Sequence, residues 1–147
     1  MNKIVIQNPR IINEGRSFIG SVLVEGDKIA AVFEGEVPGN VRAEANQVID
    51  ATGKWLIPGV IDDQVHFRDP GLTHKGDIGT ESRAAVAGGV TTFMDMPNTK
   101  PQTTTIADLE WKFNRAAEVS RANYSFFFGG TNDNMDEIRR LDRSRVP

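Results

Sequence analysis

Residues 55–71, WLIPGVIDDQVHFRDPG, mark the point at which the character of the sequence changes. A dense apolar run, interrupted by Pro58-Gly59, leads into a series of polar side chains and a closing Pro-Gly pair. Beyond this stretch, segments typical of strands and of helices alternate along the chain. Repeated strand–helix units form parallel sheets, so these residues predict the entry into an α/β domain.

Two strand–helix units follow this entry. Residues 77–87 predict a helix, and Gly88-Gly89 behind them is a typical helix end. Residues 91–96 predict a strand. Residues 105–108, TIAD, have the form of a capping box and open a second helix. The apolar stripe expected on that helix consists of Ile106, Leu109, Phe113 and Ala116.

A further unit ends the chain. Residues 124–128 predict a strand, and Asn132 or Asp133 is expected to cap a last helix. Acidic residues come early and arginines come late in that segment, which matches the helix dipole. The side chains expected to face inward are Met135, Ile138 and Leu141.

The residues before position 55 predict a small sheet. Glu25-Gly26-Asp27-Lys28 is a typical reversal between two strands. Short β-branched runs predict strands at 4–6, 21–24, 29–33 and 48–49.

We therefore expect two parts with a boundary at residue 54. Residues 1–54 would form a small β-rich domain, part of a β-sandwich, which needs another element to cover one face. Residues 55–147 would form three βα units of a parallel α/β domain. Three units are too few to close a barrel, which takes eight.

The composition excludes several classes of function. Lys and Arg number 17 against 20 Asp and Glu, and the resulting net charge of −3 gives no support for nucleic-acid binding. No apolar run approaches the roughly 18 residues of a membrane span, and the first residues lack a signal-peptide apolar region. Cysteine is absent, which excludes thiolate metal sites and suits a reducing compartment, so a cytoplasmic location is expected.

The densest polar pattern lies at residues 62–68. If a strand continues through this stretch, alternate side chains share one face. At the C-terminal end of a parallel strand, such side chains line the mouth of an active site. The four that would share the face are Asp62, Gln64, His66 and Arg68.

Two interpretations of these residues remain open. His66 could ligate a metal ion through a neutral imidazole, and Arg68 could bind a carboxylate with its two-pronged guanidinium. In the structural alternative, Arg68 pairs with Asp62 or Asp69, and His66 bonds a backbone carbonyl. His74 is expected to be a solvated loop residue.

A second candidate site is residues 95–101, DMPNTKP, which follow the second predicted strand and would lie at the same mouth. Asn98 offers both a donor and an acceptor to a ligand. The alternative is an ordinary turn, since Pro-Asn is a common turn pair.

Together these stretches resemble the amidohydrolase superfamily. Residues 48–62 resemble its passage from the small β-domain into barrel strand one. Residues 65–71, VHFRDPG, are similar to the motif His-x-His-x-Arg-x-Pro-Gly, and residues 88–99, GGVTTFMDMPNT, are similar to the second-strand motif. The first motif is shared with allantoinases, whereas Met-Pro-Asn-Thr is typical of dihydroorotases. The chain therefore resembles most a dihydroorotase of the long bacterial type.

The resemblance implies a β-sandwich portion followed by the first three βα units of a TIM-like (β/α)8 barrel. It implies a hydrolase that uses one or two zinc ions to interconvert dihydroorotate and N-carbamoyl-aspartate in pyrimidine synthesis. By the same resemblance, His66 is a metal ligand, and Arg68 and Asn98 bind the carboxylate of the substrate.

Two departures from the family pattern stand out. Gln64 occupies the place of the first metal histidine, and an amide oxygen is a poor substitute for imidazole at a zinc site. Asp62 or Asp63 could contribute instead, or Asp62 could orient His66 without touching the metal. The family pattern also places Pro147 before barrel strand four, so the catalytic residues are expected beyond Pro147 and the chain alone is expected to be inactive.

Two other functions remain open at this stage. Gln64 is compatible with a non-catalytic dihydroorotase-like scaffold, which the resemblance connects with aspartate transcarbamoylase. Another cyclic amidohydrolase, such as an allantoinase, is the other alternative. A small-molecule substrate and homo-oligomerisation are expected, and nucleic-acid or membrane partners are not.

Overall fold

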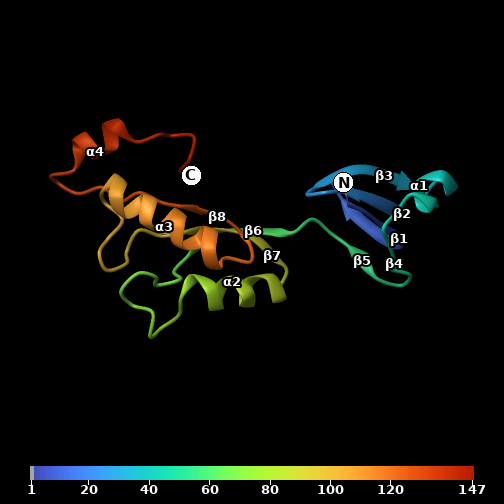
Figure 1. The fold of residues 1–147 in the computed structure, drawn as a ribbon, viewed down its shortest axis with the longest axis horizontal. Coiled ribbons are helices and arrows are strands. Elements are labelled where there is room, and N and C mark those ends of the chain that lie inside the picture. Colours follow the sequence, from blue (N-terminus) through green and yellow to red (C-terminus); the bar gives the residue numbers. More distant parts are fainter. Residues whose placement is uncertain (1) are drawn as a thin grey trace. The chain divides into compact units, whose positions relative to one another are not determined.

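The computed structural model describes residues 2–147. The chain forms two compact units, Met1–Pro58 and Gly59–Pro147, which are coloured from blue to green and from green to red in Figure 1. No helix in the described part of the chain is long and apolar enough to cross a membrane.

The first unit is a five-stranded sheet in which β1 is central. β2 pairs antiparallel with β1, and β3 pairs antiparallel with β2. On the other edge of β1, β4 and β5 each pair in parallel with a different part of the strand. A short helix, α1 (Gly39–Ala43), precedes β4. The strands are β1 (Lys3–Asn13), β2 (Arg16–Glu25), β3 (Lys28–Glu34), β4 (Gln47–Asp50) and β5 (Trp55–Leu56).

All four strands expected in this unit form, and the three expected first are longer than their apolar runs. Strand β1 continues beyond the apolar residues 4–6 through polar residues such as Gln7 and Arg10. These residues stay in the strand because β2 and β5 pair with the β1 backbone there. Trp55 and Leu56 pair with Arg10 and Ile11, so they belong to this unit, whereas the sequence assigned them to the following one.

The second unit is a parallel sheet in the order β6–β7–β8, with a helix in each connection. Helices α2 and α3 contact each other and pack against β7 and β8, respectively. The elements are β6 (Val60–Val65), α2 (Ile78–Ala87), β7 (Val90–Asp95), α3 (Ile106–Val119), β8 (Asn123–Phe126) and α4 (Met135–Arg140). These are the three βα units expected from the sequence.

The core of this unit lies between the sheet and the helices. Phe93 of β7 is fully buried, and its ring packs against Phe67 at 4.5 Å between centroids. The buried apolar residues are Phe67, Ile78, Phe93, Leu109, Ala116 and Phe126. Strand β7 therefore presents Phe93 to the helices, and Asp95, two residues further on, is buried as well.

The end of the chain differs from the expectation. Asn134 precedes α4, rather than Asn132 or Asp133, and its side chain bonds Thr104 O and Gly129 O instead of capping the helix. Met135 is 56% exposed, so its expected inward orientation is wrong. Strand β8 ends at Phe126, two residues short of the expected end at 128.

Helix α2 begins with a complete capping box. The Asp77 carboxylate accepts from Thr80 N at 2.9 Å, and the Thr80 hydroxyl accepts from Asp77 N. The Thr80 amide lowers the pKa of Asp77 below 3.8. The capping energy is therefore present above pH 3.8 and is lost as the pH falls through the lowered pKa.

We expect Asp77→Ala to lower the free energy of unfolding by about 1 kcal/mol at pH 7. The difference from the parent protein should shrink in acid, because the protonated carboxyl caps poorly. Asp77→Asn keeps the accepting oxygen and should show little loss. Urea unfolding at pH 7 and pH 3 checks this; an equal loss at both pH values would contradict it.

Gly71 lies in the loop after β6, at the point where this loop contacts the loop after β7. Its φ is +81°, and a Cβ placed there would lie 2.0 Å from Lys100 O. Next to it, Lys100 N donates to Pro70 O at 3.1 Å. A side chain at position 71 would therefore be strained and would push the two loops apart.

We expect Gly71→Ala to destabilise the protein by about 3 kcal/mol, since backbone strain and overpacking add. Gly89→Ala is the matched control: φ there is +92°, but nothing lies within 4 Å of the added Cβ. Urea unfolding of both variants separates steric contact from strain. Equal losses would show that the Lys100 contact has no effect.

Candidate functional site

The C-terminal ends of β6 and β7 bring two of the predicted site residues, His66 and Asn98, into contact. The two strands are parallel, and Met96 N donates to Val65 O at 3.0 Å where they end. His66 and Asn98 follow directly, and His66 Nδ1 lies 2.9 Å from Asn98 Oδ1. Two segments more than 30 residues apart in the sequence thus meet at one edge of the sheet, where parallel sheets carry their binding sites.

The bond between His66 and Asn98 determines what each can still do. An amide oxygen only accepts, so this bond requires the proton on His66 Nδ1. In the neutral imidazole this leaves the lone pair on His66 Nε2, and the Asn98 Nδ2 group keeps its protons for a ligand. The bond expected in the structural alternative, from His66 to a backbone carbonyl, is replaced by this side-chain pair.

Arg68 lies on the loop beyond the strand. Because β6 ends at Val65, the strand alternation expected to extend to Arg68 is wrong. Arg68 has a φ of +65° and is half-buried. Within residues 2–147, its side chain makes no hydrogen bond or ion pair. A guanidinium without a protein partner can accept a ligand carboxylate without first breaking a salt bridge.

The carboxylates that Arg68 was expected to pair with are engaged elsewhere. Asp69 is buried and accepts from Arg115 Nε at 3.3 Å. Asp62 accepts from the backbone of Gln64 at 3.1 Å. The structural alternative for Arg68 is therefore wrong. His74 is exposed, as expected for a loop residue.

A buried ion pair beneath these loops was not foreseen from the sequence. Lys112 Nζ of α3 donates to Asp95 Oδ2 of β7 at 2.8 Å, and both side chains are fully buried. Burial lowers the pKa of Lys112, and the Asp95 carboxylate opposes this shift. The available signal was a lysine at the position between Leu109 and Ala116 on the apolar stripe of α3.

A hollow adjoins Asn98 at the ends of β7 and β8. Its volume is about 230 Å³, and it opens to solvent. Such a volume is somewhat below the roughly 300 Å³ at which small-molecule sites usually begin. Its lining residues are Pro97, Asn98, Gln102, Thr104, Gly129 and Gly130.

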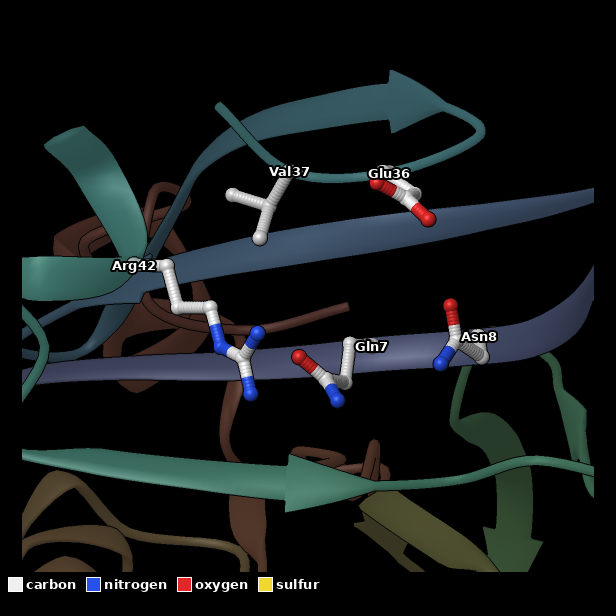
Figure 2. A pocket seen from close by; sticks show the side chains of 5 residues that line it. All are labelled: Gln7, Asn8, Glu36, Val37 and Arg42. Atoms are coloured by element: carbon white, nitrogen blue, oxygen red, sulfur yellow. The ribbon is translucent and has the colours of Figure 1, made fainter. Parts of the chain in front are cut away.

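A second polar hollow lies within the first unit. It has a volume of about 120 Å³, well below the usual size of a ligand site. Figure 2 shows its lining residues, with the Arg42 guanidinium directed toward the Gln7 amide. Arg42 and Glu36 supply opposite charges, so the hollow has no net preference for an anion or a cation.

The described residues do not fit a zinc site by themselves. A catalytic zinc ion takes three protein ligands and one open position. Among residues 2–147, no three His, Cys, Asp or Glu side chains are placed to hold a metal ion. His66 is exposed at this edge, where Nε2 offers one imidazole donor.

Parallel βα units with polar residues at their C-terminal edge, after a small β-sheet, are the arrangement that this chain shares with enzymes of the amidohydrolase superfamily. The chain belongs to the Dihydro-orotase-like family, whose sequence model matches residues 53–138.

Individual relatives agree with this assignment. An allantoinase of Streptomyces avermitilis is 37% identical over 98% of this chain and 32% of its own length. A dihydroorotase of Streptococcus thermophilus is 45% identical over 73% of this chain and 24% of its own length. The solved L-hydantoinase (dihydropyrimidinase) of Arthrobacter aurescens has a TM-score of 0.84 at 32% identity, covering 95% of this chain and 30% of its own. The chain thus spans about a quarter to a third of the length of these relatives.

Proposed function

We propose that this chain is the N-terminal portion of a cytoplasmic, metal-dependent cyclic amidohydrolase that interconverts dihydroorotate and N-carbamoyl-aspartate in pyrimidine biosynthesis. The observation that carries the proposal is the juxtaposition of His66 and Asn98 at 2.9 Å, with the unpaired side chain of Arg68 two residues beyond His66. The chain alone is proposed to be inactive, because its residues do not complete a metal site.

Arg68 and Asn98 are proposed to bind the carboxylate of the substrate. The guanidinium supplies charge and two parallel donors, and the Asn98 amide supplies a further N–H donor. His66 is proposed to hold Asn98 in this orientation through Nδ1 and to contribute Nε2 to a metal ion, zinc by the family resemblance. The bound metal would polarise the amide carbonyl.

The choice of dihydroorotate over other cyclic amides rests on charge. Dihydroorotate carries a carboxylate, whereas allantoin and hydantoin are neutral near pH 7. An unpaired arginine beside an amide donor suits the charged substrate, and the Met-Pro-Asn-Thr sequence that supplies Asn98 supports the same choice. Similarity to an allantoinase and to a hydantoinase makes those neutral substrates the competing candidates.

A substrate panel tests the proposal. The full-length protein is assayed with dihydroorotate, N-carbamoyl-aspartate, allantoin and hydantoin at equal concentration. We expect kcat/KM for dihydroorotate to exceed that for either neutral substrate by at least about 100-fold, since a site built for a charged group discriminates strongly. Preference for allantoin or hydantoin would refute the assignment.

A second candidate function is a non-catalytic scaffold, which Gln64 favours because it stands where the family pattern has a metal histidine. In that case the protein would bind a partner, with aspartate transcarbamoylase or a second copy as the proposed ones. No turnover in the panel, together with a stable complex in size-exclusion chromatography, would support this candidate.

Gln64→His is expected to raise the zinc affinity of the full-length protein by about 10-fold or more, because imidazole is a far better zinc ligand than an amide. Competition with a chromophoric chelator measures the affinity. His66→Gln should weaken it, and His74→Gln is the matched control, since His74 is an exposed loop residue. Unchanged affinity in Gln64→His would place the metal ligands elsewhere.

A further inference from the structure

The buried pair of Asp95 and Lys112 lies directly behind the two loops that carry the candidate site. Asp95 is the last residue of β7, three residues before Asn98. Lys112 is in the middle of α3, and its ammonium group reaches the C-terminal end of β7. Both side chains are 0% exposed, so neither can contact a ligand in solvent.

Each oxygen of the Asp95 carboxylate has a separate task. Oδ2 accepts from Lys112 Nζ at 2.8 Å, and Oδ1 accepts from the backbone N of Phe67 at 2.9 Å. Phe67 is the residue between His66 and Arg68. The Asp95 carboxylate therefore holds the backbone of the first loop between the two candidate site residues, His66 and Arg68.

The Lys112 ammonium holds the second loop as well. It donates to Met96 O at 3.0 Å, two residues before Asn98, and lies 5.4 Å from the centre of the Phe126 ring. One ammonium group thus contacts the carboxylate that holds the first loop and the backbone that leads into the second. The two loops contact each other through the bond between His66 and Asn98.

Stability alone does not explain this arrangement. A buried ion pair is costly to desolvate, and well-packed apolar residues of similar volume often serve a core equally well. The bonds to Phe67 N and Met96 O, by contrast, are directional and specify where each loop leaves the sheet. Apolar side chains could fill the space but could not make these bonds.

We propose that Asp95 and Lys112 are positioning residues, which hold the loops of His66, Arg68 and Asn98 in register for binding a carboxylate substrate. The positioning of the two loops does not depend on which ligand binds. That it serves to bind a carboxylate substrate rests on the proposed function. Neither residue touches substrate. Their effect reaches the site through the backbone of Phe67 and of Met96.

Histidine NMR and ligand affinity test the proposal together. The full-length protein is labelled with ¹⁵N-histidine, and the His66 signals are assigned by their loss in His66→Gln. The variant is Lys112→Met, which keeps an unbranched chain of similar length. Leu109→Ala is the matched control, because Leu109 is a buried residue of the same helix and its apolar side chain cannot hydrogen-bond to either loop. His74 in each sample is the internal reference.

In the protein freed of metal by a chelator, we expect Lys112→Met to change the His66 ring from one fixed tautomer, protonated on Nδ1, to a mixture, with His74 unchanged. Affinity for N-carbamoyl-aspartate should fall by at least about 10-fold. Leu109→Ala should lower the melting temperature and leave the His66 signals as they are. Unchanged His66 signals in folded Lys112→Met would overturn the proposal.

A second variant covers the case in which Lys112→Met does not fold. The double variant Asp95→Asn with Lys112→Met removes both charges and leaves an oxygen that can accept from Phe67 N. It too should fold with altered His66 signals, because the link to Met96 O is lost. Failure of both variants to fold would contradict a positioning role and indicate a general requirement of the core.

The outcomes separate this inference from the proposed function. If the parent protein does not bind N-carbamoyl-aspartate, the proposed substrate is wrong, yet the His66 signals still report on the positioning. If the parent protein binds it and Lys112→Met leaves both affinity and His66 signals intact, the positioning role is wrong and the substrate assignment stands.

Discussion

Arg68→Ala in the full-length protein is expected to lower kcat/KM for dihydroorotate by about 30-fold or more. The Arg68 side chain has no hydrogen-bond or ion-pair partner among residues 2–147, so its removal breaks no internal polar contact. Loss of a charge-assisted pair with a substrate carboxylate costs on the order of 2 kcal/mol or more. Steady-state kinetics at several dihydroorotate concentrations measure the change.

Two controls define the cause of that effect. Arg68→Lys keeps the positive charge but loses the paired N–H donors of the guanidinium, so its kcat/KM should lie between those of the parent protein and Arg68→Ala. Arg139→Ala removes an exposed arginine of α4 and should change nothing. If Arg68→Ala keeps both the KM and the kcat of the parent, the role assigned to Arg68 is wrong.

Lys112→Met is expected to lower the free energy of unfolding by about 3–5 kcal/mol. It leaves the Asp95 carboxylate fully buried without its counter-charge, and breaking a buried pair in this way is strongly destabilising. The double variant Asp95→Asn with Lys112→Met should be less destabilised than Lys112→Met, because no uncompensated charge remains. Urea unfolding at pH 7 measures both.

The comparison of these two variants isolates the electrostatic contribution. If the double variant is as unstable as Lys112→Met, packing rather than charge is the cause. If Lys112→Met loses less than about 1 kcal/mol, Asp95 is not buried as a charged group in the folded protein.

The order of strands and helices could be predicted because each element carries local signals. Helix α2 ends before Gly88-Gly89 as expected, and the Gly26-Asp27 turn joins β2 and β3. Asp77, which was expected within the helix, is its N-cap. Strand ends were less predictable. β1 continues through Gln7 and Arg10 because its neighbours supply hydrogen bonds, which the side chains of a single strand do not encode.

The candidate site was predictable in its residues but not in its contacts. The position of Asn98 after a strand indicated that it would lie near His66, since parallel strands end at one edge. The tight turn at Arg68 was not predictable, because a positive φ at an arginine has no local signal. Lys112 was missed because a lysine on a helix is usually solvated, and its partner Asp95 lies 17 residues earlier.

A crystal structure of the full-length protein bound to dihydroorotate would show directly which residues hold the substrate carboxylate. We expect the carboxylate within hydrogen-bond distance of the Arg68 guanidinium and of Asn98 Nδ2, with Asn98 Oδ1 still bonded to His66. A carboxylate bound away from Arg68 and Asn98, or at another edge of the sheet, would refute their proposed role in binding.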